Sequence, residues 1–467
     1  MRFTLLKGNE FCNHYRVADH ETTYYLILKC SVISKIRKYN EIIMSTSSRR
    51  KFIAMSSMAS LGALGSGQLA SAQKPQIQSK VSDLLDLTEY QVIDHHSHGH
   101  NPVEMLKPEP WNFTSMFYHG LRDDGSMPEG SKEMSDRLKF HISQTGVVLA
   151  SVAQLSQLYG CPDTLEAVVI ARHKRIIEDS DGYIKSLYNK AKIKAIVFDG
   201  QSLGVADPPS LPAKVWHLVP NDAIFKDCLK KSDSLEDFRK SYLEGISTTL
   251  KNKKYIAVKC HIGENVSLAV YEIPVSEVEA LFANAKKGDP EAIKKVYLLS
   301  FNDLAHYCCE QGVAIHMHTG TTGDLFKTPL ANTLDPFLLI PYLSRPELKR
   351  LKVVLLHAGN PWIRNAAHMA YNFPNVYLDM GWVFPWTALA HNLILEEVMS
   401  IAPLSKIFYG AGCHTGPEPA YIGAMVIKQT LTSALSNLIE DKYLTRRQAE
   451  EVAHQILHSN AERLYNI

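Results

Sequence analysis

The residues best suited to chemistry are histidines placed two apart at the ends of short apolar runs. His96 and His98 end the run over residues 92–98, and His316 and His318 end a second run. Side chains alternate along a strand, so residues i and i+2 lie on the same face. Two imidazoles side by side supply half of a four-ligand metal site. We therefore expect a metal centre where these strands end.

Two further apolar runs end in chemically useful turns. The run over residues 353–357 ends in His357, and the run over residues 406–412 ends in Gly410-Ala411-Gly412. Strands whose C-terminal ends all carry polar or glycine-rich turns are typical of a (β/α)8 TIM barrel, where the active site lies at that face.

The elements that must position these residues alternate in type along the chain, which favours a parallel sheet with crossover helices. Eight strands are predicted, at 90–96, 193–198, 214–219, 255–261, 313–318, 352–357, 375–380 and 406–410. Helices are predicted at 163–190, 233–251, 276–287, 289–311, 362–372, 386–400 and 445–464, the last with Thr445 as N-cap. Residues 99–150 and 321–348 are rich in Pro, Gly and aromatic residues, which predicts long loops above the barrel mouth.

Composition narrows the class of ligand. The chain has 467 residues, is 45% hydrophobic and carries a net charge of +2 without long runs of one sign. This balance gives no reason to expect nucleic acid or a membrane surface as a partner, so we expect a small-molecule substrate. No CxxC spacing occurs, so neither a zinc ribbon nor a disulfide framework is indicated. A homo-oligomer is compatible with all of this.

The N-terminal region is expected to be a targeting segment. Residues 48–53, Ser-Arg-Arg-Lys-Phe-Ile, resemble a twin-arginine export signal, and an uncharged stretch after them closes with Ala70-Ser71-Ala72. Residues 44–72 are therefore predicted to be a signal peptide, and residues 1–43 a mis-assigned start or a disordered extension. The twin-arginine machinery would then export the folded barrel domain, residues 73–467, to the periplasm or the medium without stable membrane insertion.

Several motifs between residues 90 and 467 resemble one family. Besides His96-x-His98, they are AVKCHIG, AIHMHTG, VVLLHAGNPWIRNAAHMAYNFPNVYLDMGW, GCHTGPEP and ILHSNAERLY. Their order and spacing are similar to the amidohydrolase-related, metal-dependent hydrolase family, in the branch shared with decarboxylases and FluG-type proteins. The resemblance implies a (β/α)8 barrel with one or two divalent ions at the C-terminal ends of the strands, zinc being the expected metal.

The resemblance also implies roles for individual histidines. His96, His98 and His318 match metal ligands of the first and fifth strands. His316 points the same way as His318, and would be either another ligand or a hydrogen-bonding support for one. His357 matches a ligand of the second metal in two-metal members, and a catalytic acid or base in one-metal members.

Lys259 lies on a predicted strand, and alternation places it on the same face as Tyr255, Ala257 and His261. A lysine that points into a barrel is costly unless it is paired or modified. In the family such a lysine is carbamylated and bridges two metals, or binds a substrate carboxylate. The alternative is a lysine at a strand end whose ammonium reaches solvent.

The eighth strand departs from the family pattern. Its usual ending carries an Asp that binds metal and takes a proton from water, whereas Gly412 stands at that position. His414 has the same parity and is the expected replacement base; Cys413 or Glu418 could serve only through a turn. An Asp introduced at 412 is expected to restore such a base. Asp379, at the end of the seventh strand, is expected either to be structural or to hydrogen-bond a metal ligand.

The function predicted from the sequence is metal-dependent hydrolysis of a C–N or C–O bond in a small, carboxylated substrate, with His357, Lys259 and His414 as catalytic residues. One alternative is non-oxidative decarboxylation on the same scaffold. The other is a catalytically silent barrel that binds a small molecule, because the eighth-strand Asp is absent.

Overall fold

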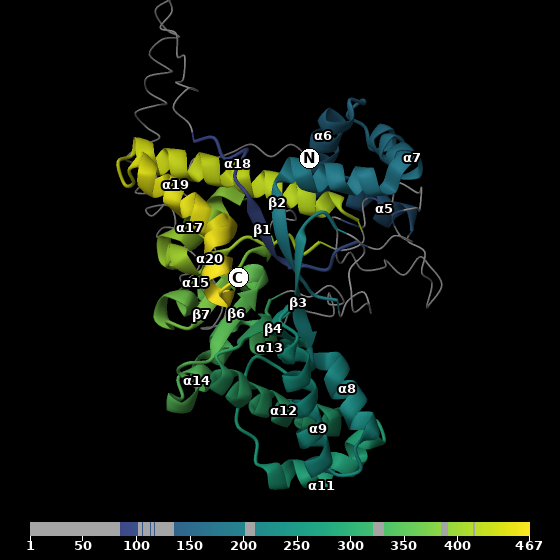
Figure 1. Cartoon of the computed structure of the whole chain (residues 1–467), viewed down its shortest axis with the longest axis vertical. Coiled ribbons are helices and arrows are strands. Elements are labelled where there is room, and N and C mark those ends of the chain that lie inside the picture. The colour runs from purple at the N-terminus through teal and green to yellow at the C-terminus, as the bar shows by residue number, and fades with distance from the viewer. Residues whose placement is uncertain are drawn as a thin grey trace, which may run out of the picture. The chain divides into compact units, whose positions relative to one another are not determined.

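The computed structural model describes residues 85–100, 105, 113, 116, 135–200, 211–320, 331–383, 391–413 and 416–467. Internal contacts divide the chain into two units, Met1–Ser79 and Lys80–Ile467, and all described residues belong to the second (Figure 1). The expected extension over residues 1–43 and the expected signal peptide over residues 44–72 lie outside them.

Eight parallel strands form one sheet and follow each other in chain order: β1 (Val92–Ser97), β2 (Ile193–Phe198), β3 (Lys214–Pro220), β4 (Tyr255–Cys260), β5 (Ala314–His318), β6 (Lys352–Leu356), β7 (Val376–Asp379) and β9 (Ile407–Phe408). The short strand β8 (Gly381–Trp382) is not part of this sheet. Backbone hydrogen bonds from His95 N to Tyr409 O (2.9 Å) and from Gly412 N to His96 O (2.7 Å) join β1 to β9 and the turn after it. They close the sheet, and the predicted (β/α)8 barrel is confirmed.

Helices surround this sheet (Figure 1). They are α5 (Asp136–Ser143), α6 (Gly146–Tyr159), α7 (Leu165–Ala191), α8 (Asn221–Lys231), α9 (Leu235–Lys251), α10 (Ile262–Asn265), α11 (Val275–Lys286), α12 (Pro290–Gln311), α13 (Ala331–Leu334), α14 (Ile340–Leu343), α15 (Ile363–Asn372), α17 (His391–Ile401), α18 (Glu418–Glu440), α19 (Arg446–His454) and α20 (Asn460–Tyr465). Short 3-10 turns η3 (Pro336–Leu339), η4 (Pro346–Leu348), η5 (His357–Gly359) and η6 (Leu404–Lys406), and a π-helix η7 (Gln455–Ser459), complete the described elements. Helix α7 packs on β2, α9 on β3 and β4, and α12 on β5.

The hydrophobic core has two layers. Alanines, branched aliphatic side chains and one phenylalanine from most strands fill the barrel interior, namely Ile93, Ala195, Val197, Leu218, Ala257, Ala314, Val354, Leu356 and Phe408, with Ala461 of α20. A larger apolar layer lies between the strands and the helices. The barrel interior is therefore packed by these described residues, and the chemistry is expected where the strands end.

Helix ends follow ordinary capping chemistry. The Asp289 side chain accepts a hydrogen bond from Ala292 N (2.8 Å) and Pro290 opens α12, which stops at Gly312 in the left-handed conformation. Thr445 caps α19 in a capping box with Gln448, as predicted. The helix predicted over 445–464 divides into α19, η7 and α20, and it ends at Tyr465.

The structure corrects the element predictions in two respects. The predicted loops contain helices: α5 and the start of α6 lie within 99–150, and α13 and α14 lie within 321–348. Helices α8 and α18 were also missed. The first half of α18 is buried on nearly every side, so it shows no amphipathic period, and Pro417 and Pro419 at its start read as a turn. No helix among the described residues has both the length and the apolar character needed to cross a bilayer.

Candidate metal centre

The end of β1 places two histidines together at the barrel mouth. The pairing of β1 with β2 is irregular between Asp94 and Ser97, the segment that contains His96. His96 and His98 are buried, with ring centroids 4.8 Å apart. Neither ring nitrogen of His96 has a hydrogen-bond partner within the described residues. A buried imidazole without partners is costly, and a bound cation would remove that cost.

Asp199 follows β2 and adds a carboxylate to these histidines. One ligand atom from each of His96, His98 and Asp199 lies within 4.8 Å of the others. The Nδ1 of His98 donates to the Asp199 carbonyl (3.0 Å), which makes Nε2 the acceptor atom of that ring. Two imidazoles and one carboxylate are a common donor set for divalent metals, so these residues fit a metal ion.

Electrostatics favour ligation by the histidines. Burial holds the pKa values of His96 and His357 well below 6.5, and the charge of Lys259 or of neighbouring histidines adds to this. Burial also lowers the pKa of His98, to about 4. A histidine must be neutral to bind a metal, and these rings are neutral at ordinary pH.

Lys259 points into the barrel, as its alternation predicts. Its Nζ lies 2.9 Å from Asp199 Oδ2, and both side chains are 1% exposed. The alternative of an ammonium that reaches solvent is therefore wrong. Burial alone would raise the pKa of Asp199, but the charges of Lys259 and His98 outweigh it and hold that pKa well below its ordinary value. A carbamate on Lys259 would place another anion beside Asp199, so the ion pair favours an unmodified ammonium.

A second donor group combines His261, Glu264 and His318. One ligand atom from each lies within 4.8 Å of the others, and His318 Nε2 is 3.4 Å from Glu264 Oε1. His261 directly follows β4, and Glu264 lies on α10. The Glu264 side chain is 27% exposed, so solvent reaches it, and partial burial raises its pKa. A carboxyl group of this kind is suited to proton transfer.

His261 is held by a carboxylate behind it. Its Nδ1 is 2.5 Å from Asp222 Oδ2, and Asn265 Nδ2 donates to Asp222 Oδ1 (3.1 Å). The hydroxyl of Tyr297 also donates to this carboxylate. Such an arrangement fixes the ring and leaves Nε2 for a ligand or a proton.

His357 lies between the two donor groups. Its ring centroid is 5.3 Å from that of His96 and 4.5 Å from that of His318. Its Nδ1 donates to Gly381 O (3.2 Å), and its Nε2 has no hydrogen-bond partner within the described residues. The indole of Trp382 stacks on this ring at 4.0 Å. His357 is therefore placed either to bind metal or to carry a proton, the two roles that the sequence left open.

Trp382 fills the space beside Gly412. Its Nε1 donates to the Gly412 carbonyl (3.0 Å), and a Cβ added at Gly412 would lie 2.1 Å from the indole Cδ1. Gly412 also has φ +62°, a conformation that strains any other residue. The expectation that an Asp at 412 would restore a base is therefore wrong, because the indole already occupies that space.

Three other residues were expected as possible replacements for the missing Asp: His414, Cys413 and Glu418. His414 lies outside the described residues. The Cys413 Sγ is 3.0 Å from Ser97 Oγ, and burial raises the pKa of this thiol to about 12, so it stays protonated at ordinary pH and cannot accept a proton. Glu418 is buried in an ion pair with Arg172 and accepts a hydrogen bond from Tyr183 (2.7 Å). Neither Cys413 nor Glu418 is suited to accept a proton from water.

A second layer of polar residues lies below the mouth. His95 Nδ1 is 2.7 Å from Asp379 Oδ2, and His95 Nε2 is 2.6 Å from the Tyr465 hydroxyl. His316 Nε2 also contacts that hydroxyl, and its ring stacks on His95 at 4.9 Å. This geometry favours the supporting role for His316 over the ligand role, and it gives Asp379 a structural partner.

Sequence reasoning missed several residues of this site. Asp199 had a usable signal, because it follows a predicted strand with the parity of Ala195 and Val197. His261 was recognised on the inward face of its strand but given no role. Glu264, Asp222 and Trp382 had no such signal. Glu264 lies on the short helix α10, Asp222 in the first turn of α8, and Trp382 in the short strand β8.

Comparisons with known proteins relate the sequence to one family and the fold to several solved structures. A family model described as amidohydrolase matches residues 288–467. The FluG protein of Emericella nidulans is 33% identical over 115 residues, which are 24% of this chain and 13% of that protein. The chain thus corresponds to a small part of that relative.

Solved structures share the fold. A structure titled as a putative metal-dependent hydrolase from Lactobacillus casei superposes with a TM-score of 0.66 at 19% identity, covering 82% of this chain and 98% of that one. A uronate isomerase from Bacillus halodurans gives 0.55 at 12% identity, covering 81% and 94%. A glucuronate isomerase from Caulobacter crescentus gives 0.54 at 14% identity, covering 81% and 92%. At these identities the likeness shows the barrel alone. The family-model match covers less than half of the chain, so its C-terminal part is similar to amidohydrolases, and the fold is the barrel that these solved structures share.

Proposed function

We propose that this protein is a metal-dependent hydrolase that cleaves a C–N or C–O bond in a small carboxylated molecule. His96, His98 and Asp199 would hold a divalent ion, with zinc as the expected metal because imidazole and carboxylate ligands suit it. When bound, such an ion polarises a carbonyl group and lowers the pKa of water. His357 and His318 are close enough to complete the site or to accept a second ion.

The side chains of this protein would supply the proton transfers and the orientation of substrate. Glu264 takes over the role of the missing eighth-strand Asp, because it is a carboxylate at the mouth that solvent can reach. Asp222 orients His261, so that this ring can pass a proton to the leaving group. An ammonium has three N–H donors, so Lys259 can hold both Asp199 and a substrate carboxylate.

One observation carries this proposal. A carboxyl group with a raised pKa, Glu264, lies in a donor group next to a buried metal-type donor group. Hydrolysis needs a base close to an activated water, and this pairing supports it although Gly412 has no side chain.

The test combines metal content with turnover. The purified protein is assayed by elemental analysis, loaded with zinc, and supplied with a panel of N-acyl amino acids and carboxylated lactones. We expect acid release that depends on the metal, and Glu264→Gln should lower kcat about 10²–10⁴-fold while metal content stays unchanged. Glu279→Gln, at an exposed position on α11, is the matched control. Full activity in Glu264→Gln would refute the assigned base; absence of both metal and turnover would favour the silent binding barrel.

Non-oxidative decarboxylation is the second candidate. It is favoured by Trp382, whose indole fills the space beside Gly412, because decarboxylation needs no base for water. In that reaction His357 would protonate the carbanion. Assays for CO₂ release from aromatic and unsaturated carboxylic acids distinguish the two reactions, since His357→Asn would abolish CO₂ release whereas Glu264→Gln would not.

We also propose export by the twin-arginine route, on the strength of residues 48–53 and the Ala70-Ser71-Ala72 ending. Replacing Arg49 and Arg50 by Lys should keep the precursor in the cytoplasm, because the transporter reads the arginine pair itself. Normal export of that variant, measured by cell fractionation, would refute the proposal.

A further inference from the structure

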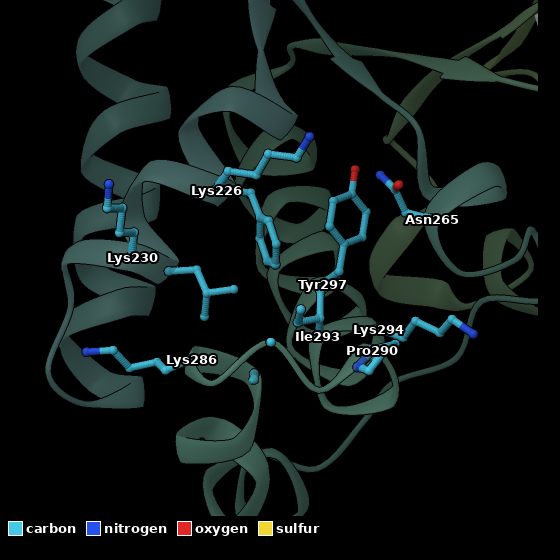
Figure 2. A pocket seen from close by; sticks show the side chains of 12 residues that line it. Lys226, Lys230, Asn265, Lys286, Pro290, Ile293, Lys294 and Tyr297 are labelled. Carbon is cyan, nitrogen blue, oxygen red and sulfur yellow. The ribbon is translucent and has the colours of Figure 1, made fainter. Parts of the chain in front are cut away.

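A hollow of about 520 Å³ lies between α8, the end of α11 and the start of α12 (Figure 2). Phe225 and Leu229 of α8 and Ala285 and Ile293 across from them supply apolar surface. Figure 2 shows Tyr297 and Asn265 at one end of this hollow. Its volume falls in the range of small-molecule sites, about 300–1,000 Å³.

The charges around the hollow are all positive. Four lysines line it and no acidic residue does: Lys226, Lys230, Lys286 and Lys294. Lys294 pairs with Glu291 (2.7 Å), and Lys286 donates to the Ser232 carbonyl. Within the part of the chain that the structure describes, Lys226 and Lys230 have no hydrogen-bond or ion-pair partner.

The spacing of these two lysines is unfavourable for the helix alone. Lys226 and Lys230 are four residues apart on α8, so their like charges lie on one face and repel each other. The adjacent Lys231 faces elsewhere and pairs with Asp227 (2.7 Å). An anion held between the unpaired lysines would relieve the repulsion.

Hydrogen bonds join the inner end of the hollow to the second donor group, through Asp222 and His261. Tyr297 is buried, and its hydroxyl donates to Asp222, to which Asn265 also donates. The same carboxylate binds His261 Nδ1 at 2.5 Å. A ligand that presses on the Tyr297 ring would therefore disturb the group that positions His261.

We propose that this hollow is a regulatory site for a small organic anion with an apolar body, and that its occupancy is transmitted to His261 through Tyr297 and Asp222. The lysines would hold a carboxylate or phosphate head, and Phe225, Leu229 and Ile293 would cover the apolar part. The binding step is independent of the proposed hydrolase reaction.

Calorimetry on the purified protein tests binding. Octanoate and octyl phosphate are the probes. Acetate and inorganic phosphate are the controls, because they carry the same anionic groups without an apolar chain. We expect at least one tailed anion to bind tenfold or more tightly than its head alone, and Lys226→Glu/Lys230→Glu to weaken it at least tenfold. Lys231→Glu/Lys240→Glu makes the same change of charge outside the hollow and should bind as the wild type does. Equal affinity in the first variant, or no binding of either tailed anion at millimolar concentration, would overturn the site.

Imidazole NMR tests the coupling without any measurement of turnover. The tailed anion that binds should shift the His261 ring resonances, which are assigned from their loss in His261→Asn. Tyr297→Phe keeps the ring on the wall of the hollow but removes the hydroxyl, so binding should persist while the His261 shift disappears. An unchanged His261 signal in the ligand-bound wild type, or a full shift in Tyr297→Phe, would overturn the proposed transmission.

Discussion

His95 and His96 are adjacent in the chain, yet their rings have opposite surroundings. Both nitrogens of His95 are engaged, one by Asp379 at 2.7 Å and the other by Tyr465 at 2.6 Å. Neither nitrogen of His96 has a partner within the described residues, although the residue is completely buried. The first histidine is already satisfied by the protein, and the second is satisfied only if something else binds.

Strand β5 also carries one histidine with a partner inside the protein and one at the mouth, two residues apart. His316 belongs to the lower layer, where it contacts Tyr465, while His318 lies at the mouth beside Glu264. Both strands thus supply one histidine to a supporting layer and at least one to the donor groups. A histidine pattern alone therefore does not identify a ligand, whereas the hydrogen bonds of each ring nitrogen do.

The largest effect is expected at the mouth. His96→Ala/His98→Ala should remove the bound metal and lower any metal-dependent turnover by at least about 10³-fold, because two of three proposed ligands are lost. The fold should persist, since strand-end ligands contribute little to the core. Elemental analysis and circular dichroism check both points. Metal retained at the wild-type level would show that these histidines are not ligands.

The lower layer should behave in the opposite way. His95→Ala leaves Asp379 Oδ2 without its partner, while Gly381 N still donates to Oδ1, and this should cost about 1–3 kcal/mol of unfolding free energy. Metal content at saturating zinc should stay unchanged. Urea denaturation measures the first effect and elemental analysis the second. Loss of metal without loss of stability would reverse the roles assigned to the two layers.

The pH dependence of stability tests whether His98 is buried in its neutral form. Burial lowers the pKa of His98 to about 4, so between pH 6.5 and 4 the unfolded state binds a proton that the folded state does not. For His98 alone, unfolding free energy of the metal-free protein should fall by about 3 kcal/mol over this window as pH decreases. Asp94, whose pKa burial raises to about 8, acts in the opposite direction. His98→Asn should therefore show a shallower loss of stability than the wild type. An identical pH dependence in both would contradict a neutral His98.

Sequence alone predicted the barrel well because its signals are local. Apolar runs with polar ends located all eight strands, each within two residues at both ends, and Thr445 was recognised as a cap. The site was predicted only in part. His96 and His98 come together as expected, but the bonds that separate His316 from His318 depend on Tyr465, 149 residues away in the case of His316. Such contacts leave no period in the sequence.

Trp382 and Gly412 provide the smallest expected effect and the sharpest test of how the mouth is built. Gly412→Asp should not raise turnover, because its Cβ would meet the indole of Trp382 and its positive φ would add strain; a cost of about 1–3 kcal/mol is expected. Removing the indole in Trp382→Ala/Gly412→Asp relieves the contact but not the φ strain, so the double variant should recover part of that stability.

Gly410→Ala is not a suitable control for this prediction, because its Cβ would meet Asp379 at 2.6 Å. Gly160→Ala shares the positive φ and has open space around it, so it isolates the cost of backbone strain. Equal losses in Gly412→Asp and Gly160→Ala would mean that the indole does not occupy the space, and an eighth-strand carboxylate would again be compatible with this barrel.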